Sequence, residues 1–318
     1  MPFELHDGDG SDPRWQESMF VAWFDLSAGI GGAHRVGHAI GAGSANVWSA
    51  LVTSDGRRWR QNHERLDVGS QRRSPDRFGA GNTNFVAEPL GIEVDDPAAG
   101  VDLHFHDYYS PVPVWNGSEA EEVASSIAPN HKEASGRVSG SVRLGETTYS
   151  VDGLFHRDHS WGARDWSTIV SHRWFVGTFG PELSFSAVVL QGPDGRYIRG
   201  GAIVRDGAIT PATHIDIVVA GEADGVSHRG GEVWMDFADG QRFGARGEVI
   251  DGVLCQQDGW VGVEGLSRIV TIEGPQLIGF GDIEISNGIR PRDVTAALRA
   301  VCVNGASTRS ADAEVKTD

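Results

Sequence analysis

Cysteine is scarce in this sequence of 318 residues. Cys255 and Cys302 are the only two, and they lack the CxxC spacing that marks zinc or redox sites. One disulfide between them is the alternative to two free thiols, and we favour free thiols in a reducing compartment. The cysteines therefore predict no zinc site.

Basic clusters and long apolar runs are also missing. The formal net charge is −17, and no block of Lys and Arg offers the basic face that phosphate binding needs, which argues against nucleic acid and against an anionic membrane surface. No run is long enough to span a bilayer, and the opening residues MPFELHDGDGSDPRW are acidic, unlike a signal peptide. We therefore expect a cytoplasmic protein without membrane insertion.

Long Ala/Leu/Glu/Lys runs are few, whereas glycine (43) and tryptophan (10) are frequent, which favours many short strands joined by tight turns. Asp-Gly pairs mark hairpins at 54–57, 192–196, 205–208 and 238–241, and Gly145 marks another at 144–147. The fold class predicted is all-β and antiparallel. Alternating apolar and polar residues predict twelve strands, at 19–27, 45–53, 84–94, 100–108, 136–151, 171–179, 183–191, 196–205, 213–220, 231–237, 242–250 and 260–273.

The β-rich chain divides into two halves of similar length near 135–155. We expect an N-terminal β domain at 1–150, a C-terminal β domain at 151–305 and a disordered tail at 306–318. A helix at 290–303, with Pro291 in its first turn, would close the second domain.

Two segments interrupt the strand pattern. Residues 67–82 are rich in Gly, Ser and Arg and predict a surface loop. Residues 109–135 contain Trp115 and a capping box of Ser118 and Glu121, which predicts a short helix within a lid or an inter-domain connection.

Residues 153–166, GLFHRDHSWGARDW, concentrate ionisable and aromatic side chains between ordinary strands. The pattern Asp-His-x-Trp-Gly at 158–162, continued by RDW at 164–166 and SHRWFVGTFG at 171–180, resembles the signature of a lipocalin-like superfamily. This superfamily includes the AttH-like proteins and the carotenoid hydratases, or hydroxyneurosporene synthases. The resemblance implies two barrel-like β domains around an apolar ligand, and cofactor-free chemistry such as hydration, cyclisation or pericyclic ring formation. It transfers a fold more securely than a reaction.

The residues of this stretch also suggest a chemistry by themselves. Adding water to an alkene needs a proton donor, and Asp158 can be that donor if burial near Phe155 and Trp161 keeps it neutral. Trp161, Trp166 and Trp174 offer π faces to a developing carbocation. His159 would orient the carboxyl group, or would hold the water and receive its proton.

A structural interpretation competes with this one. Arg157 and Arg164 flank Asp158, so charge-assisted hydrogen bonds could merely fix a tight strand corner. The strand at 182–190 also lacks the Tyr or Asp with which carotenoid hydratases supply further catalytic groups, so hydration of a carotenoid is not the favoured reaction.

Histidines offer a rival, metal-based chemistry. His104 and His106 share one face of a strand, as the first ligands of a cupin-type metal site do, and Asp107, His156 and His159 could complete a shell. The glutamate of the cupin spacing is absent, so we expect the pair to line a pocket instead, without metal. His34 and His38 also share a face and are expected to line a cavity of the first half.

The leading hypothesis is a lyase or isomerase without a cofactor, which acts by acid-base chemistry on a terpenoid, steroid-like or aromatic molecule. Its alternatives are a non-catalytic carrier of a hydrophobic molecule and a metal-dependent β-barrel enzyme. The catalytic residues expected are Asp158 and His159, and a homodimer is compatible with the sequence. The substrate-binding residues expected are Trp161, Trp166, Trp174, Phe155, His104, His106 and Trp115.

Overall fold

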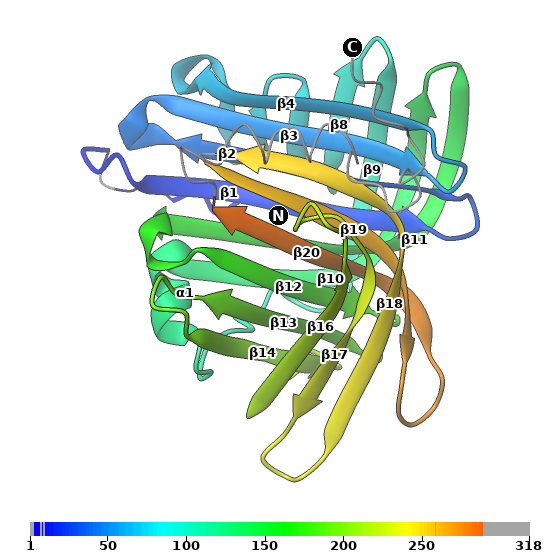
Figure 1. Cartoon of the computed structure of the whole chain (residues 1–318). Helices are drawn as coiled ribbons and strands as arrows, with labels where there is room; N and C mark the ends of the chain where they lie inside the picture. Colours follow the sequence, from blue (N-terminus) through cyan, green and yellow to red (C-terminus); the bar gives the residue numbers. More distant parts are fainter. Residues whose placement is uncertain (1–2, 7, 9, 258, 289–318) are drawn as a thin grey trace.

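A computed structural model describes residues 3–6, 8, 10–257 and 259–288, which form two curled antiparallel sheets (Figure 1). The predicted all-β class is confirmed. The first sheet consists of β1 (Trp15–Asp25), β2 (Ile30–Ala39), β3 (Ser44–Thr53), β4 (Arg58–Asp67), β5 (Arg72–Ser74), β6 (Arg77–Ala80), β7 (Thr83–Ala87), β8 (Leu90–Asp96), β9 (Ala99–Asp107), β10 (Asn130–Leu144) and β11 (Thr147–Ala163). The second sheet consists of β12 (Ser171–Thr178), β13 (Ser184–Gln191), β14 (Tyr197–Arg205), β15 (Ala208–Pro211), β16 (His214–Gly221), β17 (His228–Asp236), β18 (Arg242–Gln257), β19 (Trp260–Thr271) and β20 (Ile278–Gly288).

In each sheet most strands pair with their neighbours in the chain, and one pairing joins strands that are far apart. The first sheet has the order β4-β3-β2-β1-β11-β10-β9-β8-β7-β6-β5, so β1 pairs with β11. The second has the order β15-β14-β13-β12-β20-β19-β18-β17-β16, so β12 pairs with β20. One short helix, α1 (Glu121–Ile127), and three 3₁₀ turns, at Ile40–Ala42, Val68–Ser70 and Trp166–Thr168, complete the described chain.

The predicted hairpin turns all join consecutive antiparallel strands. Gly56 follows β3 with φ of 88°, and Gly240 follows β17 with φ of 81°. Both values lie in the left-handed region, which glycine enters without steric cost.

Several strands were not predicted from the sequence, among them β2, β4 and β20. Glycine is frequent at the start of β2, where Gly31 and Gly32 lie within the strand. A Cβ atom on Gly31 would lie 2.6 Å from the backbone oxygen of Trp23, so glycine permits close approach of neighbouring strands here. The predicted loop at 67–82 likewise contains β5 and β6.

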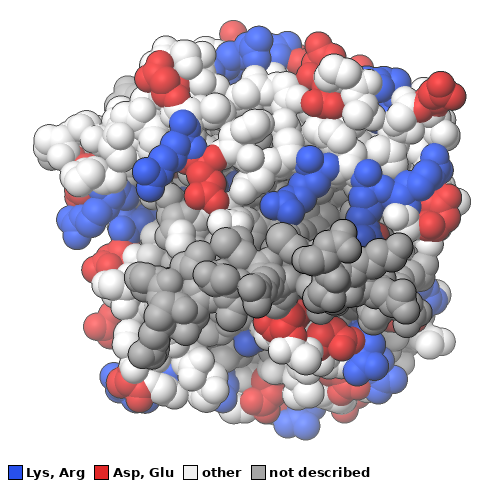
Figure 2. All heavy atoms as spheres, turned by 45° about the horizontal axis from the view of Figure 1, so that its top comes forward, with Lys and Arg blue, Asp and Glu red and all other residues white. Residues whose placement is uncertain are grey.

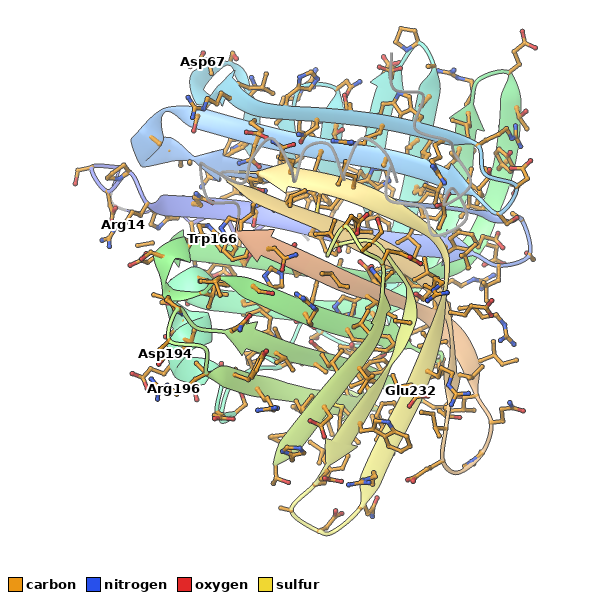
Figure 3. All side chains as sticks on the ribbon, in the orientation of Figure 1. Arg14, Asp67, Trp166, Asp194, Arg196 and Glu232 are labelled. Carbon is orange, nitrogen blue, oxygen red and sulfur yellow. The ribbon has the colours of Figure 1, made fainter. Side chains whose placement is uncertain are left out.

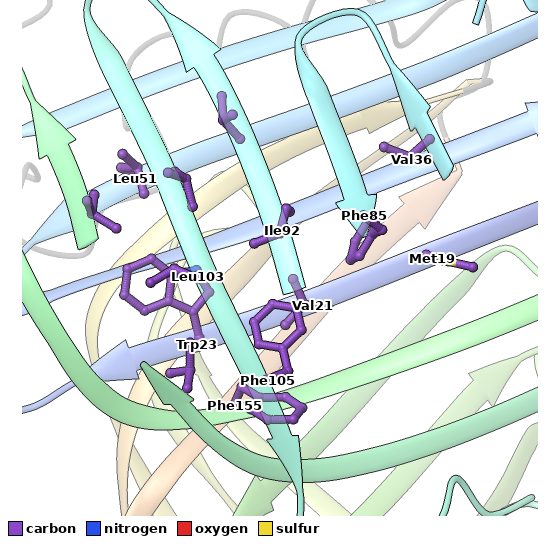
Figure 4. Packing of buried hydrophobic residues seen from close by; sticks show 14 of the residues in the cluster. Met19, Val21, Trp23, Val36, Leu51, Phe85, Ile92, Leu103, Phe105 and Phe155 are labelled. Carbon is purple, nitrogen blue, oxygen red and sulfur yellow. The ribbon is translucent and has the colours of Figure 1, made fainter. Parts of the chain in front are cut away.

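Apolar residues form separate cores within and between the sheets. One lies inside the first sheet and includes Trp23, Leu103 and Phe155 (Figure 4). Another lies inside the second sheet around Phe175 and Phe185. A third combines residues of both sheets and therefore holds the two together; its members include Phe20, Trp48, Trp174, Val188 and Leu266.

The ends of the chain add little to this description. The predicted helix at 290–303, the tail at 306–318 and Cys302 lie outside the described residues. None of the helices in the described part is both long and apolar enough to cross a membrane. Figure 2 shows acidic and basic side chains interspersed around the face that it presents.

Candidate functional site

A cavity lies between the two sheets, with an empty volume of about 970 Å³ that includes its opening to solvent. Trp115, Ile127 and Ala128, from the segment around α1, line it together with residues of both sheets. Trp166, labelled in Figure 3, lies at the end of the sheets next to α1. The aromatic lining of the cavity consists of Phe20, Trp48, Trp115, Trp166, Trp174 and Trp260. Its ionisable lining includes Arg35, His131, Asp158, Arg164, His172, Cys255, Glu264 and Glu284.

Strand register explains how the first sheet builds its wall. Residues that pair across neighbouring strands share a face of the sheet. Asp158 of β11 pairs with Phe20 of β1 on one side and with Glu133 of β10 on the other. Phe20 pairs in turn with Arg35 of β2, and Arg35 pairs with Trp48 of β3. One row across five strands thus places a carboxyl group between aromatic and charged side chains.

The second sheet builds the opposite wall in the same way. Glu284 of β20 pairs with Trp174 of β12 and with Glu264 of β19. The next row pairs His172 with Ser286. The ring centroids of Phe20 and Trp174 lie 5.8 Å apart, so the two walls touch at this point.

Asp158 is partly buried, and no hydrogen-bond donor to its carboxylate is found in the described part of the chain. Burial raises the pKa of Asp158, because a desolvated carboxylate is unfavourable, and the negative charge of Glu133 acts in the same direction. The charge of His131, when that ring is protonated, and the charges of Arg35 and Arg164 act to lower this pKa, and burial outweighs them. The carboxyl group is therefore biased toward its neutral form.

Beside Asp158 lies a buried network around Glu133. Its Oε1 atom accepts a hydrogen bond from Nε2 of His131 at 2.7 Å and another from Ser186 at 3.1 Å. Nε2 of His156 lies 3.1 Å from the other oxygen, Oε2. Burial alone would raise the pKa of Glu133, but the two histidines lower it to about 2. The His131 ring is fixed by stacking on Trp115, with ring centroids 4.0 Å apart.

Three acidic residues lie together on the opposite wall: Glu264 and Asp282 are buried, and the side chain of Glu284 is 14% exposed. Nε2 of His172 lies 2.9 Å from Oε1 of Glu284, and although burial opposes ionisation, the charge of His172 lowers the pKa of Glu284. Burial raises the pKa of Glu264 well above its usual value and that of Asp282 to about 8. The thiol of Cys255 donates a hydrogen bond of 3.6 Å to Oε1 of Glu264. This wall therefore carries neutral carboxyl groups beside one ion pair.

The structure brings four of the nine predicted catalytic and substrate-binding residues to this cavity: Asp158, Trp115, Trp166 and Trp174. It does not bring His159, Trp161 or Phe155 there, because β11 runs straight through the motif and side chains alternate along a strand. Asp158 and Ser160 face the second sheet, whereas the odd-numbered residues face the interior of the first. The expectation that Asp158, His159, Trp161 and Trp174 surround one cavity is corrected accordingly.

His104 and His106 do not reach the cavity either. The opposite face of β9 packs Val101, Leu103 and Phe105 into the first core, which leaves both histidines exposed to solvent. His34 and His38 are fully buried inside the first sheet, where Nε1 of Trp23 donates a hydrogen bond of 3.1 Å to Nε2 of His34. Desolvation lowers the pKa of His34 to about 3.

The flanking arginines have separate partners. Arg157 forms a bidentate ion pair with Asp107 on the far side of the sheet from the cavity. Arg164 is buried in the cavity wall and donates to the hydroxyl oxygens of Ser18 and Ser160, at 2.9 and 2.8 Å. Neither arginine forms an ion pair with Asp158 among the described residues.

Several cavity residues were missed at the sequence level, notably Arg35, His131, His172, Glu264 and Glu284. A usable signal was present for two of them: Glu264 and Glu284 are acidic residues within otherwise apolar strands, WVGVEGLS and GFGDIEIS. An acid in such a position is buried and needs a partner or a proton. Arg35 and His131 carried no such signal, because both lie among other polar residues, in GAHRVGH and PNHKEAS.

The model of one protein family, described as a domain of unknown function (DUF7064), matches residues 4–289 of the chain. The chain belongs to the DUF7064 family. No curated protein matches this DUF7064 chain in sequence.

Solved structures share its fold. An AttH protein from Nitrosomonas europaea superposes with a TM-score of 0.60 at 13% identity, over 86% of this chain and 92% of its own. CghA with Sch210972 gives a TM-score of 0.61 at 12% identity, over 91% and 95%. Kievitone hydratase from Nectria haematococca gives 0.58 at 9% identity, over 90% and 94%. These similarities confirm the predicted resemblance in fold to AttH-like and hydratase proteins.

Proposed function

We propose that this protein is a lyase or isomerase of the hydratase or cyclase type, which needs no cofactor and acts on an apolar small molecule between the two sheets. The observation that carries the proposal is the carboxyl group of Asp158, desolvated within an aromatic cavity. Two proteins of the same fold support it, since one is a kievitone hydratase and CghA is seen with a small molecule, Sch210972. Terpenoid, steroid-like and aromatic alkenes are the substrate classes that suit such walls.

The proposed reaction is a reversible addition of water. Neutral Asp158 transfers its proton to one carbon of the substrate alkene, and the electron pair of the double bond forms the new C–H bond. Phe20 and Trp174 face the cation that remains on the other carbon. Water adds there and loses one proton to His131, which Glu133 orients. Exchange with solvent then restores both groups, so one alkene and one water give one alcohol.

His131 takes the part that was expected of His159. With Nε2–H bonded to Glu133, the remaining ring nitrogen, Nδ1, has no hydrogen-bond partner in the described residues. A histidine held in this way by a carboxylate presents a fixed nitrogen as a base.

The test uses the molecule that the protein itself retains. Small molecules extracted from the purified protein are identified by mass spectrometry and then incubated with it in D₂O. We expect wild-type protein to incorporate deuterium into the molecule. In Asp158→Asn the rate of incorporation should be at least about 100-fold lower, while the variant still binds the ligand. Activity should also decline as rising pH removes the Asp158 proton. The matched control, Asp102→Asn, changes an exposed carboxyl group of β9 and should be silent.

Two outcomes would contradict the proposal. Unchanged deuterium incorporation in Asp158→Asn would exclude Asp158 as the acid. If wild-type protein and Asp158→Asn both retain a hydrophobic ligand and neither converts it, the result would favour a non-catalytic carrier.

A further inference from the structure

The motif at 158–162 supplies a second cluster, on the face of β11 that points away from the cavity. His159 and Trp161 lie there, opposite Glu17 of β1 and His6 of the segment that precedes β1. Glu17 is fully buried, whereas the side chains of His6 and His159 are 21% and 16% exposed, so the cluster is reachable from solvent.

Both histidines direct a ring nitrogen at one oxygen atom. Nδ1 of His6 lies 3.0 Å from Oε1 of Glu17, and Nε2 of His159 lies 2.9 Å from the same Oε1. The three potential ligand atoms all lie within 4.8 Å of one another. The His6 ring is stacked on Trp161, with centroids 3.8 Å apart and planes inclined by 7°, which fixes its direction.

We propose that His6, Glu17 and His159 bind a divalent first-row transition-metal ion, for which zinc is the natural probe. Ligand atoms about 2.1 Å from one ion lie roughly 3.0–3.4 Å apart at right-angled or tetrahedral coordination, so the two nitrogen–oxygen distances need little rearrangement. Two imidazoles and one carboxylate favour zinc, iron, cobalt or nickel over calcium or magnesium, which prefer oxygen ligands. In binding, the ion replaces the protons that now bridge the nitrogens to Oε1.

Arg73 limits the affinity and also fixes the geometry. Its guanidinium pairs with the other carboxylate oxygen, Oε2, and donates to the backbone oxygen of His6 at 2.9 Å. Glu17 can therefore offer only Oε1 to an ion. Because Arg73 already compensates the carboxylate charge, we expect micromolar rather than nanomolar binding.

The ion would connect three parts of the chain. His6 belongs to the segment before the first strand, whereas Glu17 and His159 belong to the paired strands β1 and β11. The site is separate from the cavity, since none of its three ligands lines it. Its role is thus to fasten the N-terminal segment to the first sheet, independently of the proposed catalysis.

The test is isothermal titration of tag-free, chelator-treated protein with ZnCl₂ at pH 7.5, together with thermal unfolding. We expect about one zinc ion bound per protein chain at this site, and a rise in the temperature midpoint of unfolding with zinc concentration. His6→Ala and His159→Ala should each weaken binding at least about tenfold, and lowering the pH to 5.5 should weaken it in wild-type protein because protons compete.

The matched control is the double variant His104→Ala/His106→Ala, which removes two exposed histidines of β9 and should bind zinc like wild type. His6 lies outside every strand, so its replacement leaves the strand register intact, and circular dichroism checks this. Absence of zinc binding up to 100 µM, or equal affinity in His6→Ala, His159→Ala and wild type, would overturn the proposal and leave the cluster a hydrogen-bond network. Neither result bears on Asp158.

Discussion

The buried carboxyl groups differ in charge because their immediate neighbours differ. Glu133 has two histidines around it and ionises readily, with a pKa of about 2. Asp282 is equally buried but is faced by Glu264 and Glu284, and burial together with the charge of Glu284 raises its pKa to about 8. At this scale, burial sets the cost of a charge, and the partner decides whether the residue bears it.

Asp282 leads to a prediction about stability and pH. Its folded pKa, about 8, lies above the unfolded value of 3.8, so the native state binds more protons than the unfolded state between these values. The free energy of unfolding contributed by Asp282 should therefore fall as pH rises from about 4 to about 8. Asp282→Asn removes this loss, so the variant should be more stable than wild type by over about 1 kcal/mol at pH 8.5, and the difference should vanish near pH 4.

Urea unfolding of both proteins across this pH range provides the measurement. Glu284→Gln is the informative counterpart, because it breaks the pair with His172 and should destabilise the protein at neutral pH. A constant difference between Asp282→Asn and wild type at every pH would show that Asp282 does not titrate in this range.

The motif lies in strand β11, and the backbone conformation of Gly162 near the end of this strand requires glycine. Gly162 has φ of 128°, and a Cβ atom there would lie 2.7 Å from the Pro129 ring, which follows α1. Gly162→Ala should destabilise the protein by about 1–3 kcal/mol. Chemical denaturation measures this, with Gly221→Ala as the control, since no atom lies within 4 Å of a Cβ at Gly221. Equal stability of the two variants would refute the strain argument.

The same strand shows how far the sequence predicts the fold. Asp-Gly turns and alternation revealed most strands, because both signals are local. The course of β11 through 153–163 was not predicted, because a strand buried on both faces shows no polar-apolar alternation. Its polar residues are paired with residues distant in the sequence, such as Glu17 for His159 and Glu133 for His156.

The candidate site was predictable to a smaller extent. Asp158, Trp166 and Trp174 were found because they lie in or beside the motif. Arg35, His131 and His172 were not, because the cavity is assembled by two sheets that meet in space. The side to which His159 points depends on strand register, which no local pattern specifies.

At the scale of the whole molecule, an ion pair with a buried carboxylate joins the two sheets. Arg58 of β4 donates two hydrogen bonds, of 2.9 and 3.0 Å, to the carboxylate of Asp251 in β18. Asp251 is almost fully buried. Arg58→Gln leaves this carboxylate without its counter-charge and should cost about 3 kcal/mol of unfolding free energy.

The control for Arg58 is the bidentate pair of Arg137 and Asp152, which joins strands of one sheet and is exposed to solvent. Arg137→Gln should leave stability nearly unchanged, because water replaces the lost partner. Thermal unfolding of both variants makes the comparison. Similar losses of stability would mean that the ion pair between the sheets stabilises the protein no more than the exposed pair does.

The pairing of β1 with β11 also imposes an order in time. During synthesis β1 leaves the ribosome early, but its partner follows only after Ile30–Leu144 has been translated. The other edge of β1 can meanwhile pair with β2, so an incomplete sheet with an open edge must persist on the nascent chain. The same delay applies to the second sheet, because β12 can pair with β20 only after β20 has been translated. Such late, distant closures slow folding, and they make the half-synthesised chain a natural client for chaperones that shield strand edges.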